Sequence, residues 1–121
     1  MTKRILVVED QEDNRQILRD LLANAGFDMI EAEDGVQAIA AASQHRPDLI
    51  LMDIQLPTLD GYEATRRIKA DPALTAIPII VVTSYALSGD EDKARTAGCD
   101  AYVAKPYSPR ALLAKIREFL P

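Results

Sequence analysis

Cysteine and histidine each occur only once among the 121 residues, and these absences limit the chemistry of the chain. Cys99 has no second cysteine to pair with, which excludes an internal disulfide and argues against a cysteine-based metal site. We therefore expect a reducing compartment, the cytoplasm, with Cys99 as a small buried hydrophobic residue. His45 is predicted at a helix end before Arg46 and Pro47, so the chain is a poor candidate for a phosphohistidine carrier.

Long apolar runs and an excess of basic residues are also missing. The longest apolar stretches are far too short to cross a bilayer, and the first residues lack a signal-peptide pattern because an acid pair follows only four apolar residues. The net charge of −5 disfavours nucleic acid as a partner, since phosphate backbones require a concentrated basic face. We expect a single domain over residues 1–121, with no membrane or nucleic acid as direct partner.

Short apolar runs alternate with helical patterns along the whole chain. The runs predict strands over residues 5–8, 27–32, 49–53, 77–82 and 101–104, and the helical patterns cover residues 13–25, 35–45, 62–70 and 87–97. A final helix follows Ser108 and Pro109, an N-cap and a first-turn proline. This alternation predicts an α/β fold, a flavodoxin-like (βα)5 doubly wound parallel sheet. The strand order 2-1-3-4-5 is taken from known proteins of this class, not from the sequence.

Each helical pattern predicts a core-facing side. In the first helix we expect the apolar stripe to contain Ile17, Leu18, Leu21, Leu22 and Ala25. The second helix carries Val36, Ile39 and Ala40. The third has a thin stripe, the fourth is charged and should be loosely anchored, and the last presents Leu112, Leu113, Ile116, Phe119 and Leu120.

Asp53 ends the central apolar strand, within five residues of Pro57. In an open parallel sheet the carboxyl ends of the strands open onto the ligand crevice, so we expect Asp53 to be exposed there. An aspartate before a proline-containing loop also commonly caps a turn. This stretch alone leaves both interpretations open.

Other polar residues follow three of the remaining strands. Glu9 and Asp10 come after the first strand, and Thr83 and Lys105 end the fourth and fifth. Singly, each is typical of an ordinary surface, but together with Asp53 they should face one crevice. Carboxylates that converge repel one another, which raises the pKa of at least one of them or calls for a cation. A divalent ion is the favoured outcome, and an all-oxygen ligand set suits Mg²⁺. A carboxylate beside such an ion can be a nucleophile toward phosphorus, with Lys105 neutralising phosphoryl oxygens and Thr83 donating a hydrogen bond.

Several of these segments, taken in order, resemble the receiver domain of bacterial two-component response regulators. They are residues 7–10 (VVED), 51–57 (LMDIQLP) with 60–61 (DG), 82–84 (VTS) and 104–106 (AKP). The resemblance implies that Asp53 accepts a phosphoryl group from the phosphohistidine of a histidine kinase or phosphotransferase. It also implies that Mg²⁺ is held by Asp10, Asp53 and the main-chain carbonyl of Gln55, with Glu9 acting through bound water.

The resemblance also implies a switch. Thr83 would move toward the phosphoryl group and Tyr102 would turn inward into the vacated space, while Lys105 would pair with the phosphoryl group. The bond from Lys105 to Pro106 would be cis. Phosphorylation would alter an output face over about residues 87–120, which binds a downstream protein, and the chain would be a monomer or weak dimer. Such a receiver is no classical enzyme, although it assists its own phosphorylation and dephosphorylation. Tyr107 is either an interface aromatic residue or packed against the final helix.

Residues 89–91 (GDE) and 98–102 (GCDAY) resemble single-domain regulators of the DivK type, and the initiating Met1 favours a stand-alone receiver. Similar sequences occur in receivers of hybrid kinases, so a receiver cut from a longer chain stays an alternative. Another is a docking module that works without phosphorylation. A hydrolase of the haloacid dehalogenase kind should carry a second acid where Gln55 stands, and a flavin site is disfavoured by acids after the first strand.

Overall fold

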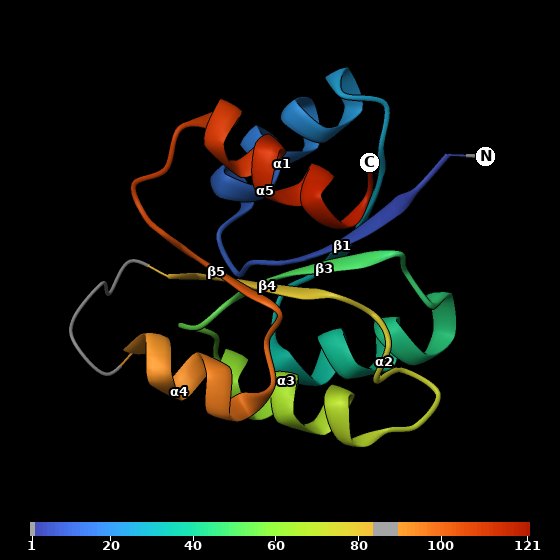
Figure 1. The fold of residues 1–121 in the computed structure, drawn as a ribbon, viewed down its shortest axis with the longest axis vertical. Helices are drawn as coiled ribbons and strands as arrows, with labels where there is room; N and C mark the ends of the chain where they lie inside the picture. The colour runs from blue at the N-terminus through green and yellow to red at the C-terminus, as the bar shows by residue number, and fades with distance from the viewer. Residues whose placement is uncertain (1, 84–89) are drawn as a thin grey trace.

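Five parallel strands form the central layer of the molecule. The computed structural model describes residues 2–83 and 90–121, without the side chains of residues 90 and 91. The sheet order is β2-β1-β3-β4-β5, as predicted. Figure 1 shows the sheet between two layers of helices. The strands are β1 (Arg4–Val8), β2 (Asp28–Ala32), β3 (Leu49–Asp53), β4 (Ile79–Thr83) and β5 (Ala101–Ala104). The helices are α1 (Glu12–Asn24), α2 (Gly35–His45), α3 (Gly61–Ala70), α4 (Asp90–Ala97) and α5 (Pro109–Phe119).

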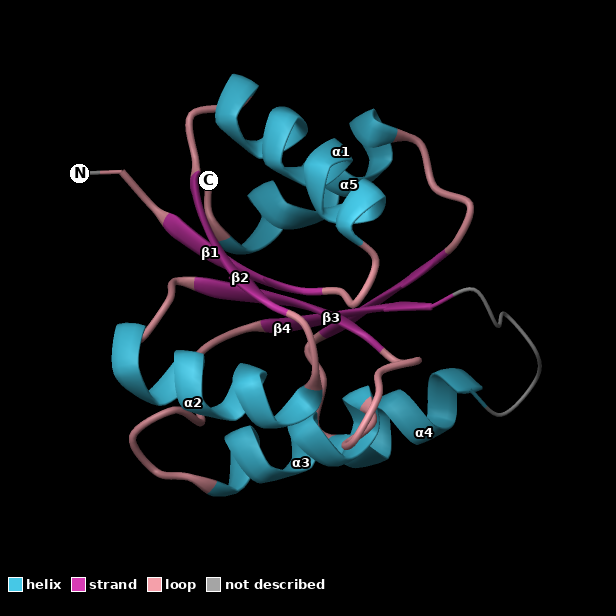
Figure 2. Cartoon of the chain, turned by 180° about the vertical axis from the view of Figure 1, so that it is seen from behind, coloured by secondary structure: helices cyan, strands magenta, loops and turns pink. Residues whose placement is uncertain are grey.

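Helices cover both faces of the sheet. Helices α1 and α5 lie on one face, and α2, α3 and α4 lie on the other (Figures 1 and 2). Alternate residues of β1 therefore enter different cores: Ile5 and Val7 pack toward α1 and α5, whereas Leu6 and Val8 pack toward α2 and α3. This burial on both faces explains why the central strands are continuous apolar runs without polar alternation.

Side-chain caps begin three of the helices within the described residues. Asp34 accepts a hydrogen bond from the Gln37 main-chain N–H at 2.7 Å, and Asp60 accepts one from Glu63 at 2.9 Å. Ser108 accepts one from the main-chain N–H of Ala111 at 3.0 Å, directly before Pro109, so the predicted start of the last helix is confirmed. The caps satisfy main-chain N–H groups that have no partner within the helix.

The predicted core position of Ile17 is wrong, because this residue is 60% exposed. Two apolar residues of the second helical pattern also lie outside the core: Val36 is 53% exposed, and Ala40 is exposed. In α1 the buried side consists of Arg15, Leu18 and Leu22, because the side chain of Arg15 fills the core-facing position in the first turn. Helix α2 packs instead through small residues, among them Ala38 and Ala42.

The region around α4 was only partly predicted. Of the predicted helix, residues 90–97 are helical and residues 87–89 lie outside the described part. The predicted strand over 77–82 is shifted, because β4 begins at Ile79 after Pro78 and includes Thr83. None of the described helices combines the length and the apolar character needed to cross a membrane.

Gly61 lets α3 begin directly against the end of β3. A Cβ atom on this residue would lie 2.0 Å from the main-chain oxygen of Asp53 and 2.9 Å from Cα of Ile54. The Gly61 N–H also donates to the carbonyl of Ile54 at 3.0 Å. Both close neighbours are main-chain atoms, so a side chain at this position must displace backbone next to Asp53.

We expect Gly61→Ala to lower the free energy of unfolding by about 1–3 kcal/mol, the usual cost of overpacking. The loss would occur although alanine favours helices more than glycine does. Urea unfolding measures it. Arg66→Ala, at an exposed position of the same helix, is the control and should change stability by less than about 0.5 kcal/mol. A Gly61→Ala variant as stable as the wild type would show that the close approach is unimportant.

Candidate functional site

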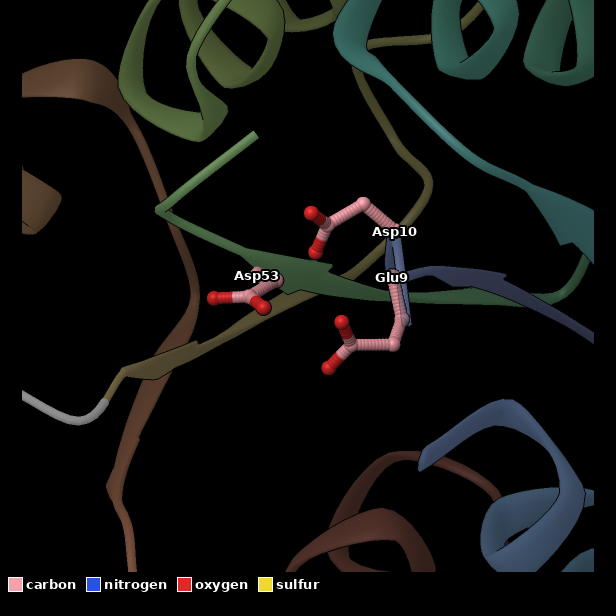
Figure 3. A group of neighbouring side chains, drawn as sticks. All are labelled: Glu9, Asp10 and Asp53. Atoms are coloured by element: carbon pink, nitrogen blue, oxygen red, sulfur yellow. The ribbon is translucent and has the colours of Figure 1, made fainter. Parts of the chain in front are cut away.

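Three carboxylates meet at the carboxyl edge of the sheet. Glu9 and Asp10 follow β1, and Asp53 ends β3, which pairs with β1 in parallel. One carboxylate oxygen from each residue lies within 4.8 Å of the other two. Figure 3 shows the Glu9 and Asp10 side chains extending in different directions from the end of β1, with the Asp53 side chain beside them on the adjacent strand. The sheet order thus brings together acids that lie more than forty residues apart in the sequence.

Lys105 provides the positive charge of this cluster. Its Nζ lies 3.3 Å from Oε1 of Glu9 and 3.4 Å from Oδ2 of Asp53. Burial acts to lower the pKa of Lys105, but the charges of Asp53 and Glu9 outweigh it and raise that pKa above its ordinary value. The side chain therefore stays an ammonium ion and offsets part of the repulsion among the carboxylates.

The surroundings of Asp10 raise the pKa of its carboxyl group. Burial raises the pKa of this carboxyl, and the hydrogen bond and charge of the neighbouring Glu9 raise it further. Both effects disfavour the ionised form. A proton therefore competes with a metal ion for Asp10 more effectively than for an isolated aspartate.

Asp53 is more buried than predicted. The residue is only 8% exposed, whereas the sequence indicated an exposed acid. Strands β1 and β4 flank β3, Lys105 lies beside the carboxylate, and Oδ1 accepts the Gln55 main-chain N–H at 3.3 Å. The carboxylate nevertheless borders a cavity, so it does not point into the closed core.

Main-chain and side-chain donors hold the Glu9 carboxylate. The Gln11 main-chain N–H donates to Oε2 at 3.0 Å, and Nδ2 of Asn14 donates to Oε1 at 3.4 Å. Asn14 was not predicted from the sequence as a residue of the site. Its position in the first turn of the helix that follows the acid pair was the available signal.

The other predicted residues lie at adjoining strand ends. Thr83 is 1% exposed, and its main-chain carbonyl accepts the N–H of Lys105 at 2.6 Å. Tyr102 stands opposite Val81 in the sheet register and packs partly against the core beneath α2, α3 and α4. The bond between Lys105 and Pro106 is cis, in agreement with the expectation from the resemblance.

A cavity of about 600 Å³ opens beside the carboxylates, on the α1 and α5 side of the sheet. Glu9, Asp53 and Lys105 border it, and the rest of its lining is mainly apolar, including the exposed Ile17 and the partly buried Tyr107. Tyr107 packs against the core beside α5, which favours the packing interpretation. The sequence pattern did not predict this cavity, because its walls come from several separate elements.

The donor set fits a magnesium ion. Glu9, Asp10 and Asp53 offer oxygen ligands, and no cysteine or histidine joins the group among the described residues. Hard cations prefer such oxygens, and Mg²⁺ usually binds through one or two carboxylates while keeping several waters. Asp10 and Asp53 are the predicted direct ligands; the carbonyl of Gln55 stays a prediction.

Comparisons with known proteins give one consistent family. The response regulator receiver domain family matches residues 5–117. The polar-differentiation response regulators DivK of Brucella ovis and of Brucella abortus are 44% identical over 120 residues, which cover 99% of this chain and 98% of theirs.

Two solved structures share the fold over nearly the whole chain. The receiver domain of a Pseudomonas aeruginosa sensor histidine kinase was solved with a magnesium ion coordinated in its active-site cleft. It has a TM-score of 0.92 and 38% identity, covering 99% of this chain and 98% of that one. The chemotaxis protein CheY4 of Vibrio cholerae has a TM-score of 0.92 and 25% identity, covering 98% and 99%.

We predict that millimolar Mg²⁺ raises the melting temperature, because a ligand that binds only the folded state stabilises it. Thermal unfolding across a magnesium titration measures the shift. Asp10→Asn should abolish most of it, whereas Asp20→Asn, which removes an exposed carboxylate of α1 outside the cluster, should keep it. A melting temperature that stays constant in the wild type would contradict the site.

Acid should weaken the same magnesium response. Because the pKa of Asp10 is raised, this carboxyl takes up its proton at a higher pH than an ordinary aspartate does. The stabilisation by Mg²⁺ is then present above that pKa and is lost as the pH falls through it. Melting curves with and without Mg²⁺ at a series of pH values measure this; an equal magnesium shift throughout would refute the competition.

Removing the Lys105 charge should tighten magnesium binding. Lys105→Met takes away a cation beside two carboxylates, and a unit charge at such a distance contributes on the order of 1 kcal/mol even in bulk water. We expect the dissociation constant to fall about fivefold or more in calorimetric titration. Lys115→Met removes the same charge from a pair with Glu118 in α5, so it serves as the control and should leave the constant unchanged. Weaker binding by Lys105→Met would overturn this.

Proposed function

Because this chain belongs to the response regulator receiver domain family of two-component signalling, we propose that Asp53 is its phosphoryl acceptor and the starting point of its switch. The observation that carries the proposal is the position of the Asp53 carboxylate. It lies in one cluster with the Glu9 and Asp10 carboxylates, 3.4 Å from the ammonium of Lys105, on the border of a cavity. Nucleophile, metal ligands and a fixed cation are thus within reach of one phosphorus atom.

The reaction would be a transfer between two protein side chains. A carboxylate oxygen of Asp53 bonds to phosphorus while the bond from phosphorus to the donor's imidazole nitrogen breaks, and the electron pair returns to the imidazole. Lys105 compensates charge on the phosphoryl oxygens as they approach. When bound by Asp10, Asp53 and Gln55, Mg²⁺ would neutralise further negative charge on those oxygens.

The response to phosphorylation would begin at Thr83. Its position at the end of β4, adjoining Lys105, suits a hydroxyl that donates to a phosphoryl oxygen. Tyr102, two residues before the end of β5 and partly buried, would then turn inward. These movements would change the α4-β5-α5 face, which we propose as the surface read by a downstream protein.

The proposed partners follow from this chemistry. A sensor histidine kinase or histidine phosphotransferase would supply the phosphoryl group, and a protein target would bind the altered face. We propose a cytoplasmic receiver that is a monomer or weak dimer. It would assist its own phosphorylation and dephosphorylation through the residues of the cluster, without turning over small substrates.

Acetyl phosphate with Mg²⁺ should add one phosphoryl group to the wild-type chain, as measured by intact mass. Asp53→Asn should give no adduct, because an amide lacks the nucleophilic oxygen. Asp20→Asn should be labelled like the wild type, and removal of Mg²⁺ by a chelator should prevent labelling. An adduct on Asp53→Asn would disprove the assignment of the acceptor.

Partner binding distinguishes a phosphorylation-controlled switch from a docking module that works without phosphorylation. With the cognate kinase or target in hand, phosphorylated wild type and Asp53→Asn should differ in affinity if Asp53 controls the output face. Equal affinities would favour the docking module. Turnover of small phosphate esters would instead favour a hydrolase, which we do not expect because Gln55 occupies the position of the second acid.

A further inference from the structure

Arg15 is a buried arginine that contacts the main chain of the acid pair, Glu9 and Asp10. The residue lies in the first turn of α1 and is only 7% exposed. Its Nη1 donates to the main-chain carbonyl of Glu9 at 2.8 Å. Arginine is almost never this buried unless its charge is paired, so the surrounding groups must account for it.

Three carboxylates compensate the positive charge of the Arg15 guanidinium group. One comes from α1, one from β2 and one from the loop that follows β2. Nε donates to Oε1 of Glu31 at 3.1 Å, and Nη2 pairs with Glu12 and, at 3.5 Å, with Glu33. Most of the charge of Arg15 is therefore already offset by nearby acids. The geometry of the guanidinium group is therefore what distinguishes Arg15 from another cation. This planar group has several N–H donors and can bind several carboxylates and one carbonyl at the same time.

The carbonyl that Arg15 holds belongs to the peptide group joining Glu9 to Asp10. The N–H of Glu9 donates on its other side to the carbonyl of Ala32, at the end of β2, at 3.0 Å. The backbone of the acid pair is thus fixed from both sides, by β2 and by α1. Rotation of this peptide group would redirect Asp10 away from Asp53.

We propose that Arg15 is a positioning residue of the magnesium site: by holding the Glu9 carbonyl, it sets the direction in which Asp10 leaves β1. The inference rests on the proposed function, since it concerns the same cluster. Arg15 is not one of the proposed metal ligands and would act only through the main chain of the acid pair. Hydrogen-bonding partners of metal ligands typically change affinity about 10- to 100-fold when removed.

The direction in which Mg²⁺ affinity changes when Arg15 is replaced shows whether this residue acts by positioning Asp10 or through its charge. If Arg15 acted only through its positive charge, a neutral replacement would strengthen the binding of a cation. If it positions Asp10, the replacement weakens binding in spite of the lost repulsion. Arg19 is the matched control: it pairs with Glu12 and Glu31 as Arg15 does, but is not among the donors to Glu9 in the described residues.

Titration calorimetry with Mg²⁺ on wild type, Arg15→Met and Arg19→Met tests the proposal. We expect the dissociation constant of Arg15→Met to rise about tenfold or more, and that of Arg19→Met to stay within about twofold of the wild type. An unchanged or lower constant for Arg15→Met, or equal changes in both variants, would overturn the proposal. Wild type that binds no Mg²⁺ would instead contradict the metal site itself.

Phosphorylation by acetyl phosphate provides a second readout. In Arg15→Met the Mg²⁺ concentration for half-maximal rate should rise, while the rate at saturating Mg²⁺ stays close to that of the wild type. A lower saturating rate with unchanged half-saturation would overturn the positioning role. If Arg15→Met does not fold, Arg15→Lys decides, because one ammonium keeps the charge but cannot hold the carbonyl and all the carboxylates together. Its dissociation constant should also rise, and an unchanged one would overturn the proposal.

Discussion

Repulsion among Glu9, Asp10 and Asp53 is the constraint that the rest of this structure accommodates. Their carboxylates are held within a few ångströms of one another by the hydrogen-bonded pairing of β1 with β3. Like charges at this distance disfavour ionisation, and the raised pKa of Asp10 is the visible result of burial combined with such a neighbour. Lys105 relieves part of the repulsion and leaves a site that still attracts cations.

Packing of the hydrophobic cores on both faces of the sheet stabilises the fold against the repulsion within this cluster. Central strands buried on both faces give two cores, and α3 begins against the end of β3 because Gly61 has no side chain. Buried Arg15 adds a second attachment for the acid pair. The acid pair after β1 and the end of β3 are therefore held in place by these contacts, so cation binding would require little rearrangement there.

The same arrangement suits a switch driven by charge. A phosphoryl group on Asp53 would add negative charge beside Lys105. The main-chain N–H of Lys105 donates a hydrogen bond to the main-chain carbonyl of Thr83. A change at the site would thereby be linked to β4 and to β5, and β5 belongs to the proposed output face. Coupling through contiguous contacts of this kind needs no long pathway, since the site and this face share β5.

The sequence by itself determined the five strands, their parallel arrangement and the polar residues at their ends, because apolar runs and capping residues act locally. The strand order was taken from known proteins of this class. It also predicted that Glu9, Asp10, Asp53 and Lys105 converge, because parallel strands place their carboxyl ends at one edge. Tertiary structure alone decided that Asp53 is nearly buried, that Ile17 faces outward and that Arg15 holds Glu9. These features depend on side chains from several elements meeting in space, and periodicity along one helix or strand carries no information about such neighbours.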